Sequence, residues 1–393
     1  MTSAHARRRR VLLSTAGALS IAAAFVFGFL SGRVGRVAPG SEAHSGGLVA
    51  EAADRLRAAA DTDVSQDELE EAAIRGMLTA LGDRYATYYD TSDYAQFQRL
   101  LDGRYSGVGL WLGRAPSGAL EVTSVVPDSP AELAGLRVGD VLVDVAGLPV
   151  DGVPVGDVVR RMHGAAGSTV SVAVRREGRV RSFVLRRADL VSKDVTYDVV
   201  TSRVGRIQVA AFTRGSGREV AAALRALREK GVNGVVLDLR GNPGGLLEEG
   251  VGAASAFLDG GSVVTYKGRG VDDKTYDVLG KGDTAIPVVV LVDAGTASAA
   301  EVVAGALQDR NRAIVVGSRT YGKGSVQQPI VLSDGSAIEV TVATYYTPSG
   351  RSVDRVGIVP DVDLPPGYDA RAALRRAVEV LAGTVASIPA PRG

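Results

Sequence analysis

Ser298, Lys323 and Gln327 lie in two short glycine-containing segments, and together they could carry out nucleophilic chemistry. Ser298 follows the apolar run 286–293 and a turn with Gly295, at the start of an expected helix. Its hydroxyl would therefore sit at a strand-to-helix elbow. A serine hydroxyl is a poor nucleophile until a base removes its proton. A serine in this position could equally cap the helix that follows.

The sequence offers few candidates for that base. The three histidines lie near the N-terminus or in a separate β-rich segment (His5, His44 and His163). Lys323, flanked by two glycines, is the remaining common choice, because burial would lower its pKa and leave a neutral amine that accepts a proton. The alternative is that Lys323 is a solvated loop tip.

Two further groups could complete such a site. Gln327 lies four residues beyond Lys323, so on an extended segment both side chains would point to the same face and Gln327 could orient the amine. It could also be an ordinary exposed residue. The loop "RGNPGG" supplies Gly244 before a helix, and its amides, with the Ala299 amide beside the serine, could polarise a carbonyl oxygen. Such glycines also cradle phosphates, but no G-x-x-x-x-G-K-[ST] run is present.

Alternating strands and helices are expected to position these residues. From about residue 204 the chain alternates apolar strands with amphipathic helices, and the strands are nearly continuous apolar runs. This pattern predicts a layered α/β core with a parallel sheet covered on both faces, over residues 188–365. An Asp334-Gly335 turn indicates a β-hairpin within it. A helix and a tail follow, over residues 366–393.

Two smaller regions precede this core. Residues 48–102 have a helical pattern, with Ser65 as the expected N-cap of a helix whose apolar face carries Ile74, Met77, Leu78 and Leu81. Residues 103–187 contain short β-rich runs separated by glycine and proline turns, which predicts a compact β module.

Composition excludes several classes of protein. The chain has 393 residues with 45 Lys plus Arg against 44 Asp plus Glu, a net charge of +1. There is therefore no overall field to attract nucleic acid. The absence of cysteine removes disulfides, thiolate metal sites and a cysteine nucleophile. We expect neither a metal nor an organic cofactor.

The N-terminus predicts a membrane segment. Arg7 to Arg10 form a basic cluster within residues 1–10, residues 11–30 carry no charge, and residues 31–47 read as a linker. The uncharged run is long enough to span a bilayer, and the arginines before it favour a cytoplasmic N-terminus. We expect a single-pass transmembrane helix with everything after it outside the cytoplasm. A signal peptide that is cleaved before secretion is the alternative.

The β module resembles a PDZ domain. The segments "YSGVGLWL", "SPAELAGLRVGDVLVDVAG" and "VPVGDVVRRMHGAAGSTVSVAV" carry the resemblance. It implies that the loop of Ser106, Gly107, Val108 and Gly109 holds the terminal carboxylate of a peptide, which joins the sheet edge as a strand. The alternative is that the glycines only permit a tight turn.

The core resembles the C-terminal processing proteases, also called tail-specific proteases. The segments "LDLRGNPGG", "DAGTASAAEVVAGALQD", "VGSRTYGKGSVQ" and "TYYTPSGRSVDRVGIVPD" carry this resemblance. It implies a crotonase/ClpP-like core and a serine endopeptidase. Ser298 would be the nucleophile, Lys323 the general base and Gln327 its orienting residue, with Gly244 and Ala299 as oxyanion donors.

The implied function is cleavage of proteins near apolar C-terminal tails that the PDZ domain captures. An oligomer or an activating partner is compatible with the resemblance. Two other functions stay open. The chain could be a catalytically silent PDZ adaptor at the cell surface, although all three proposed catalytic residues are present. It could also be a crotonase-like acyl enzyme, although a PDZ module makes a thioester substrate a poor fit.

Overall fold

The computed structural model describes residues 26–27, 45–114, 118–126, 128–153, 155–365 and 369–387. The predicted membrane segment, 11–30, lies outside the described residues except for Val26–Phe27. These two residues form strand β1, so their backbone is extended where a helix was predicted. The basic N-terminus and most of the linker also lie outside. Within the described residues, no helix is both long enough and apolar enough to cross a membrane.

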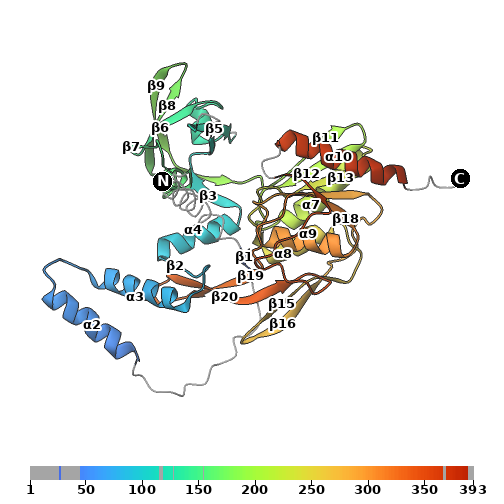
Figure 1. Cartoon of the computed structure of the whole chain (residues 1–393). Helices are drawn as coiled ribbons and strands as arrows, with labels where there is room; N and C mark the ends of the chain where they lie inside the picture. The colour runs from blue at the N-terminus through green and yellow to red at the C-terminus, as the bar shows by residue number, and fades with distance from the viewer. Residues whose placement is uncertain are drawn as a thin grey trace, which may run out of the picture.

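The first helix of the N-terminal region projects away from the rest of the protein, whereas its later elements lie closer to it (Figure 1). It contains α2 (Ser45–Ala59), α3 (Gln66–Leu81), β2 (Thr87–Tyr89) and α4 (Thr91–Leu101). Ser65 caps α3 as predicted, forming a capping box with Glu68. The predicted apolar face is only partly covered, because Met77 is 57% and Leu81 59% exposed.

The predicted β module contains an antiparallel sheet, in the order β4-β5-β6-β8-β9. Its hydrophobic core is built by alternating strand residues together with α6. The elements are β3 (Arg104–Gly107), β4 (Leu110–Arg114), β5 (Leu120–Val125), α5 (Pro130–Leu133), β6 (Val141–Val145), β7 (Leu148–Pro149), α6 (Val155–Met162), β8 (Thr169–Arg176), β9 (Arg179–Arg186) and β10 (Ala188–Val191).

The chain enters the β module from the N-terminal region and leaves it for the α/β core at adjacent points. Strands β3 and β10, at its two ends, pair antiparallel. The Ser192 amide donates to the Gly103 carbonyl at 2.9 Å, and the Arg214 amide from the core donates to the Leu101 carbonyl at 2.9 Å. The side chain of Gln96 on α4 contacts His163 Nδ1 at 3.1 Å, at the end of α6. Helix α4 of the N-terminal region therefore contacts both the core and the module.

The core contains the predicted parallel sheet, in the order β11-β12-β13-β17-β18-β21. Only the edge strand β11 is antiparallel to its neighbour in this sheet. Every residue of β13 and β17 is buried, as expected for strands covered on both faces. The strands are β11 (Val195–Thr201), β12 (Val204–Val209), β13 (Gly234–Asp238), β17 (Val288–Val292), β18 (Ala313–Gly317) and β21 (Val362–Asp363).

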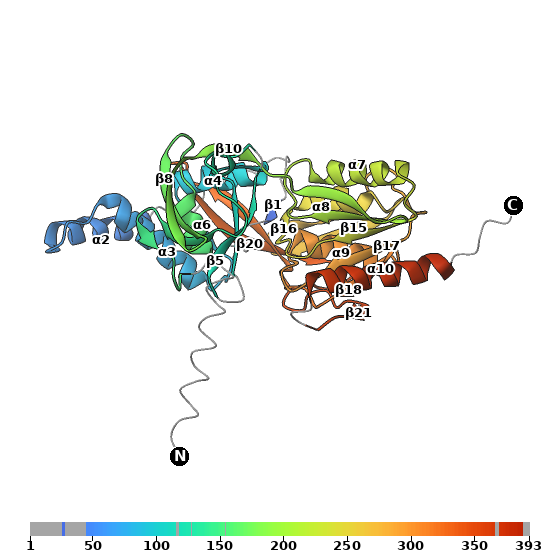
Figure 2. The same cartoon turned by 90° about the horizontal axis from the view of Figure 1, so that it is seen from above.

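Helices cover the two faces of this sheet (Figure 2). Side chains from α7 (Ser216–Glu229), α8 (Leu247–Ser255) and α9 (Ala299–Asp309) share one hydrophobic cluster with alternate strand residues. Residues of α10 (Ala370–Ser387) share a second cluster with the intervening strand residues. The layered α/β prediction is therefore confirmed.

A second sheet lies beside the first and was predicted only in part. Its strands are β15 (Ser262–Gly268), β16 (Val271–Asp277), β19 (Ser325–Val331) and β20 (Ala337–Tyr346), with β2 paired to β20. The hairpin of β19 and β20 around Asp334-Gly335 was predicted, whereas β15 and β16 were not. Through β2, the N-terminal helical region becomes part of the sheet that carries Gln327.

Candidate active site

Ser298 occupies the elbow that the sequence predicted, between β17 and α9. Its backbone has φ 57° and ψ −121°, a conformation that L-residues rarely adopt. The residue is 0% exposed, and among the described residues its Oγ has no hydrogen-bond partner. Strain of this kind persists where the surroundings hold it, and it is frequent at active sites. The hydroxyl is thus presented by the backbone and does not cap a neighbouring amide.

Lys323 is buried, which excludes the solvated loop tip. It is 1% exposed, and its Nζ lies 5.0 Å from the centre of the Tyr85 ring. Burial lowers the pKa of Lys323 to about 8, while the negative charge of Glu339 opposes the decrease. The neighbouring Gly324 packs so closely against Asp354 that a side chain there would overlap its backbone. The loop therefore needs glycine to bring the lysine inside.

Glu301, which the sequence analysis did not identify, connects the serine and lysine segments. Its Oε2 accepts hydrogen bonds from the amides of Ser298 and Lys323, each at 2.8 Å. Its Oε1 accepts from the Thr320 hydroxyl at 2.5 Å and from the Gly322 amide at 2.8 Å. Burial raises the pKa of Glu301, and these four hydrogen bonds oppose the increase. One buried carboxylate thus holds the backbones of both predicted catalytic residues.

Gly244 lies against the serine, as predicted, but its amide points elsewhere. A Cβ at Gly244 would lie 2.8 Å from Ser298 Cβ and 3.1 Å from the Ala299 amide nitrogen. The Gly244 amide donates to Asn242 Oδ1 at 2.8 Å. In this structure it is therefore not available to a substrate oxygen, which differs from the predicted oxyanion role. Ala299 begins α9, where a first-turn amide has no acceptor within the helix.

Gly244→Ala is expected to reduce both stability and activity. The φ of Gly244 is +106°, and the added Cβ would fall within 3.0 Å of Ser298 Cβ. The serine elbow or the glycine loop would have to shift, and a small displacement at a reacting centre can lower the rate by about 100-fold. Gly280→Ala is a control, since Gly280 also has a positive φ (+76°) but open space around its Cβ position. Equal kcat/KM for the two variants would contradict this prediction.

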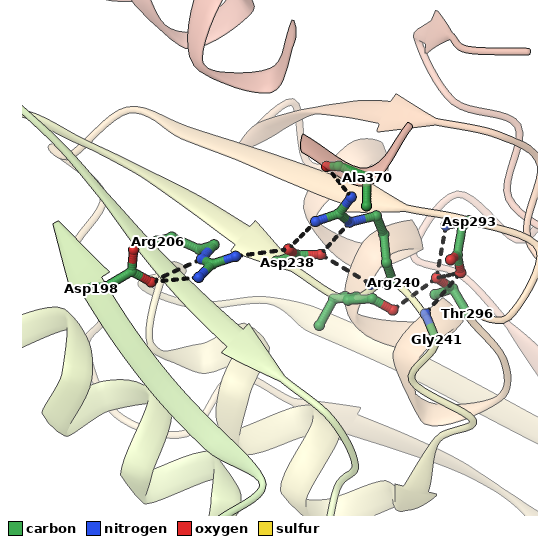
Figure 3. Close-up of polar contacts among 9 residues, drawn as sticks. Asp198, Arg206, Asp238, Arg240, Gly241, Asp293, Thr296 and Ala370 are labelled. Atoms are coloured by element: carbon green, nitrogen blue, oxygen red, sulfur yellow. Dashed lines mark hydrogen bonds and ion pairs between the residues drawn. The ribbon is translucent and has the colours of Figure 1, made fainter. Parts of the chain in front are cut away.

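A polar network fixes the glycine loop and the serine turn to each other (Figure 3). Asp293 Oδ1 accepts from the Gly241 amide at 2.8 Å, and the Thr296 hydroxyl donates to the Leu239 carbonyl at 2.8 Å. On the other side, Arg240 binds the buried Asp238 at 2.8 and 2.6 Å and donates to the Ala370 carbonyl at 2.7 Å. The network therefore ties both loops to the sheet and to α10.

Gln327 lies near the lysine loop but not on one strand with Lys323. Strand β19 begins at Ser325, after Lys323, and its pairing with β20 shifts register between Val326 and Gln327. The prediction that both side chains share a face of one strand is therefore wrong. The Gln327 Nε2 donates to Ser325 Oγ at 2.7 Å, while its buried Oε1 has no partner among the described residues. This oxygen is an acceptor that an amine could use.

The predicted PDZ loop is tightly packed. Gly109 has φ +84°, and a side chain there would overlap Ser129. The Val108 side chain is buried, and its carbonyl accepts from the Ala131 amide at 2.9 Å. The buried Ser106 Oγ has no hydrogen-bond partner among the described residues. The tight turn is thus real, and binding of a carboxylate there stays a prediction.

The described residues contain no cluster of three or more acidic, histidine or cysteine side chains suited to a metal ion.

Comparison with known proteins identifies the family. Residues 203–364 match peptidase family S41, and residues 121–176 match the PDZ domain. A carboxyl-terminal-processing protease of Picosynechococcus sp. is 36% identical over 308 residues, covering 77% of this chain and 74% of that protein. The chain therefore belongs to the carboxyl-terminal-processing proteases of family S41, which are serine-type peptidases.

Two other relatives agree with this assignment. The solved structure of the photosystem II D1 C-terminal processing protease is 32% identical, with a TM-score of 0.55, covering 85% of this chain and 97% of that one. The chloroplastic carboxyl-terminal-processing peptidase 3 of Arabidopsis thaliana is 35% identical over 311 residues. That match covers 75% of this chain but only 60% of the plant protein. The predicted resemblance is confirmed.

Proposed function

We propose that this peptidase cleaves proteins near apolar C-terminal tails, with Ser298 as nucleophile and Lys323 as general base. The observation that carries the proposal is that the Ser298 and Lys323 amides bind the same oxygen of Glu301, each at 2.8 Å, inside a buried site. Burial also lowers the pKa of the lysine to about 8, so a neutral amine is accessible near physiological pH.

The reaction would proceed through an acyl-enzyme. Neutral Lys323 takes the proton of Ser298 as Oγ forms a bond to the peptide carbonyl carbon. The lysine ammonium then gives that proton to the departing amine as the C–N bond breaks. Water hydrolyses the acyl ester in a second round that uses the same lysine, and Gln327 Oε1 would orient the amine throughout.

The oxyanion would be stabilised at the start of α9. The Ala299 amide there benefits from the positive end of the helix dipole. Gly244 would contribute once its amide leaves Asn242. Immediately after Gly244, β14 (Gly245–Leu246) pairs in parallel with the extended β1. An extended polypeptide therefore fits beside the glycine loop, as a substrate backbone would have to.

The PDZ domain would capture the substrate by its terminal carboxylate at Ser106 to Gly109. We expect a protein with a free, apolar C-terminus to be cleaved with a kcat/KM about ten times higher than the same protein with an amidated C-terminus. Hydrogen bonds to a charged acceptor contribute about 1.5–3 kcal/mol, and 1.4 kcal/mol corresponds to a tenfold change. Competition kinetics on an equal mixture would measure the ratio. Equal cleavage of both forms would remove carboxylate capture from the mechanism.

Residues 11–30 would anchor the protease in the cell membrane with its catalytic part outside the cytoplasm, which requires Val26–Phe27 to leave their pairing with β14. This proposal rests on the uncharged run and the preceding arginines. Release into the medium after cleavage of that segment would instead indicate a signal peptide.

The overall proposal is tested with the full chain and an unstructured protein that ends in an apolar tail. Fragments would be identified by mass spectrometry for the wild type and for Ser298→Ala. Fragments from the wild type alone would support the proposal. Binding of the tail without cleavage by either protein would instead favour the silent adaptor.

A further inference from the structure

A second buried carboxylate is linked to Lys323 through one short segment, in which Tyr85 contacts the lysine and Tyr89 binds the carboxylate, and the mechanism above does not use it. Glu339 lies on β20 and is 1% exposed. Its Oε2 accepts a hydrogen bond from the Tyr89 hydroxyl at 2.9 Å, and Tyr89 belongs to β2 of the N-terminal region. A carboxylate buried in this way is unfavourable without compensation, so its presence beside a functional amine calls for an explanation.

The surroundings of Lys323 single out Glu339 among the nearby charges. Four charged groups act on the lysine: Glu339 from β20, Arg84 and Asp83 from the loop before β2, and Glu301 from α9. Asp83 accepts from the Thr341 amide at 2.7 Å, Arg84 donates to Asp354 at 3.1 Å, and Glu301 is held by its four donors. Of the four charges, that of Glu339 has the largest effect on the pKa of Lys323.

The charge of Glu339 and the charge of Lys323 each stabilise the charged form of the other group. Burial raises the pKa of Glu339 to about 7, while the Tyr89 hydrogen bond and the charge of Lys323 lower it and Asp83 raises it further. An ionised Glu339 stabilises the lysine ammonium and therefore disfavours the neutral amine that a general base must be. While it is ionised, Glu339 therefore keeps the lysine protonated to a higher pH than burial alone would.

We propose that Glu339, held by Tyr89, is a positioning residue that delays the conversion of Lys323 to its neutral, basic form as the pH rises. The inference rests on the proposed role of Lys323. Through Tyr89, the N-terminal region would then influence the pH dependence of the protease activity.

The test is the pH dependence of kcat/KM of the full chain for peptide cleavage, comparing wild type with Glu339→Gln. Glutamine keeps the shape and can still accept from Tyr89 but carries no charge. The activity rise with pH is expected to move to lower pH by less than one unit, because Glu339 is itself protonated below about pH 7 and then has no charge to lose. The difference in activity, about twofold, is expected between the pKa values of the two groups, about 7 and 8, and should vanish at lower pH, where position 339 is uncharged in both proteins.

A second variant makes the test independent of how well Glu339→Gln folds. Tyr89→Phe removes the hydrogen bond that favours ionised Glu339, so it should shift the profile in the same direction by a smaller amount. Tyr88→Phe is the matched control, since neighbouring side chains on a strand face opposite sides. Its profile should coincide with that of the wild type.

Two results would overturn the inference. In the first, the midpoint of the pH–activity profile stays in place while Glu339→Gln and Tyr89→Phe lose activity equally at every pH, as a purely structural role would produce. In the second, the midpoint moves to higher pH. Both results would leave the serine-lysine mechanism intact. That mechanism fails on a different observation, namely full activity after replacement of Lys323.

Discussion

Lys323→Ala is expected to lower kcat for peptide cleavage by about 10²–10⁴-fold, the usual contribution of a positioned general base. The structure supports this size of effect because the lysine is 1% exposed and its segment shares Glu301 with the serine. Burial lowers the pKa of Lys323 to about 8. Because only the neutral amine accepts a proton, wild-type activity should rise as the pH increases through that value. The measurement is kcat against pH under single-turnover conditions.

Two further variants separate the loss of the base from the loss of a buried side chain. Lys323→Arg keeps a positive charge, but its guanidinium does not act as a base in this pH range, so it should be as inactive as Lys323→Ala. Lys281→Ala removes an exposed lysine from the same core and should leave activity unchanged. Thermal unfolding would report any loss of stability. A folded Lys323→Arg protein with wild-type kcat would show that the base lies elsewhere.

The parts of the site that could be read from the sequence are those with local signals. Ser298 follows an apolar strand and a glycine turn, and Lys323 stood out because no histidine was suitably placed. Glu301 also had a local signal, since a serine followed by a glutamate three residues later is the pattern of a capping box. In the structure the Ser298 amide does bind this glutamate. The N-cap alternative was considered for Ser298, but the glutamate three residues later was not considered with it.

Other parts of the site depend on contacts between distant segments, which leave no local pattern. Tyr85 and Tyr89 reach the lysine and Glu339 only because β2 pairs with β20. Strand β2 has three residues, too few for a recognisable period. The Gly244 amide likewise could not be assigned from the sequence, because its direction is set by the hydrogen bond to Asn242.

The same distinction between local signals and long-range contacts explains which strands of the fold were predicted. Strands β13 and β17 were predicted because burial on both faces requires continuous apolar residues. Strands β15 and β16 were missed because β16 is polar and at most half-buried along its whole length. The turn between them was the available signal, since Gly270 has φ +81° and glycine favours that conformation.

Glu301→Gln is expected to destabilise the protein by about 2–4 kcal/mol and to lower kcat/KM by at least about 100-fold. Each oxygen of the carboxylate accepts two hydrogen bonds, so either orientation of the glutamine amide places an NH2 group against two donors. Ser298 and Lys323, or Thr320 and Gly322, would then lose their buried acceptor. Chemical unfolding and cleavage kinetics measure the two effects on the same preparation.

Glu379→Gln provides the control for this last variant, because Glu379 is exposed on α10 and pairs with Arg376 at 3.0 Å on the surface. A surface ion pair of this kind contributes at most about 1 kcal/mol, so both stability and activity should stay near the wild-type values. If Glu301→Gln also retained both, the shared carboxylate would not be what holds the serine and lysine segments together. If it lost activity but kept its stability, Glu301 would serve chiefly to align Ser298 with Lys323, since the fold would tolerate the change and the reaction would not.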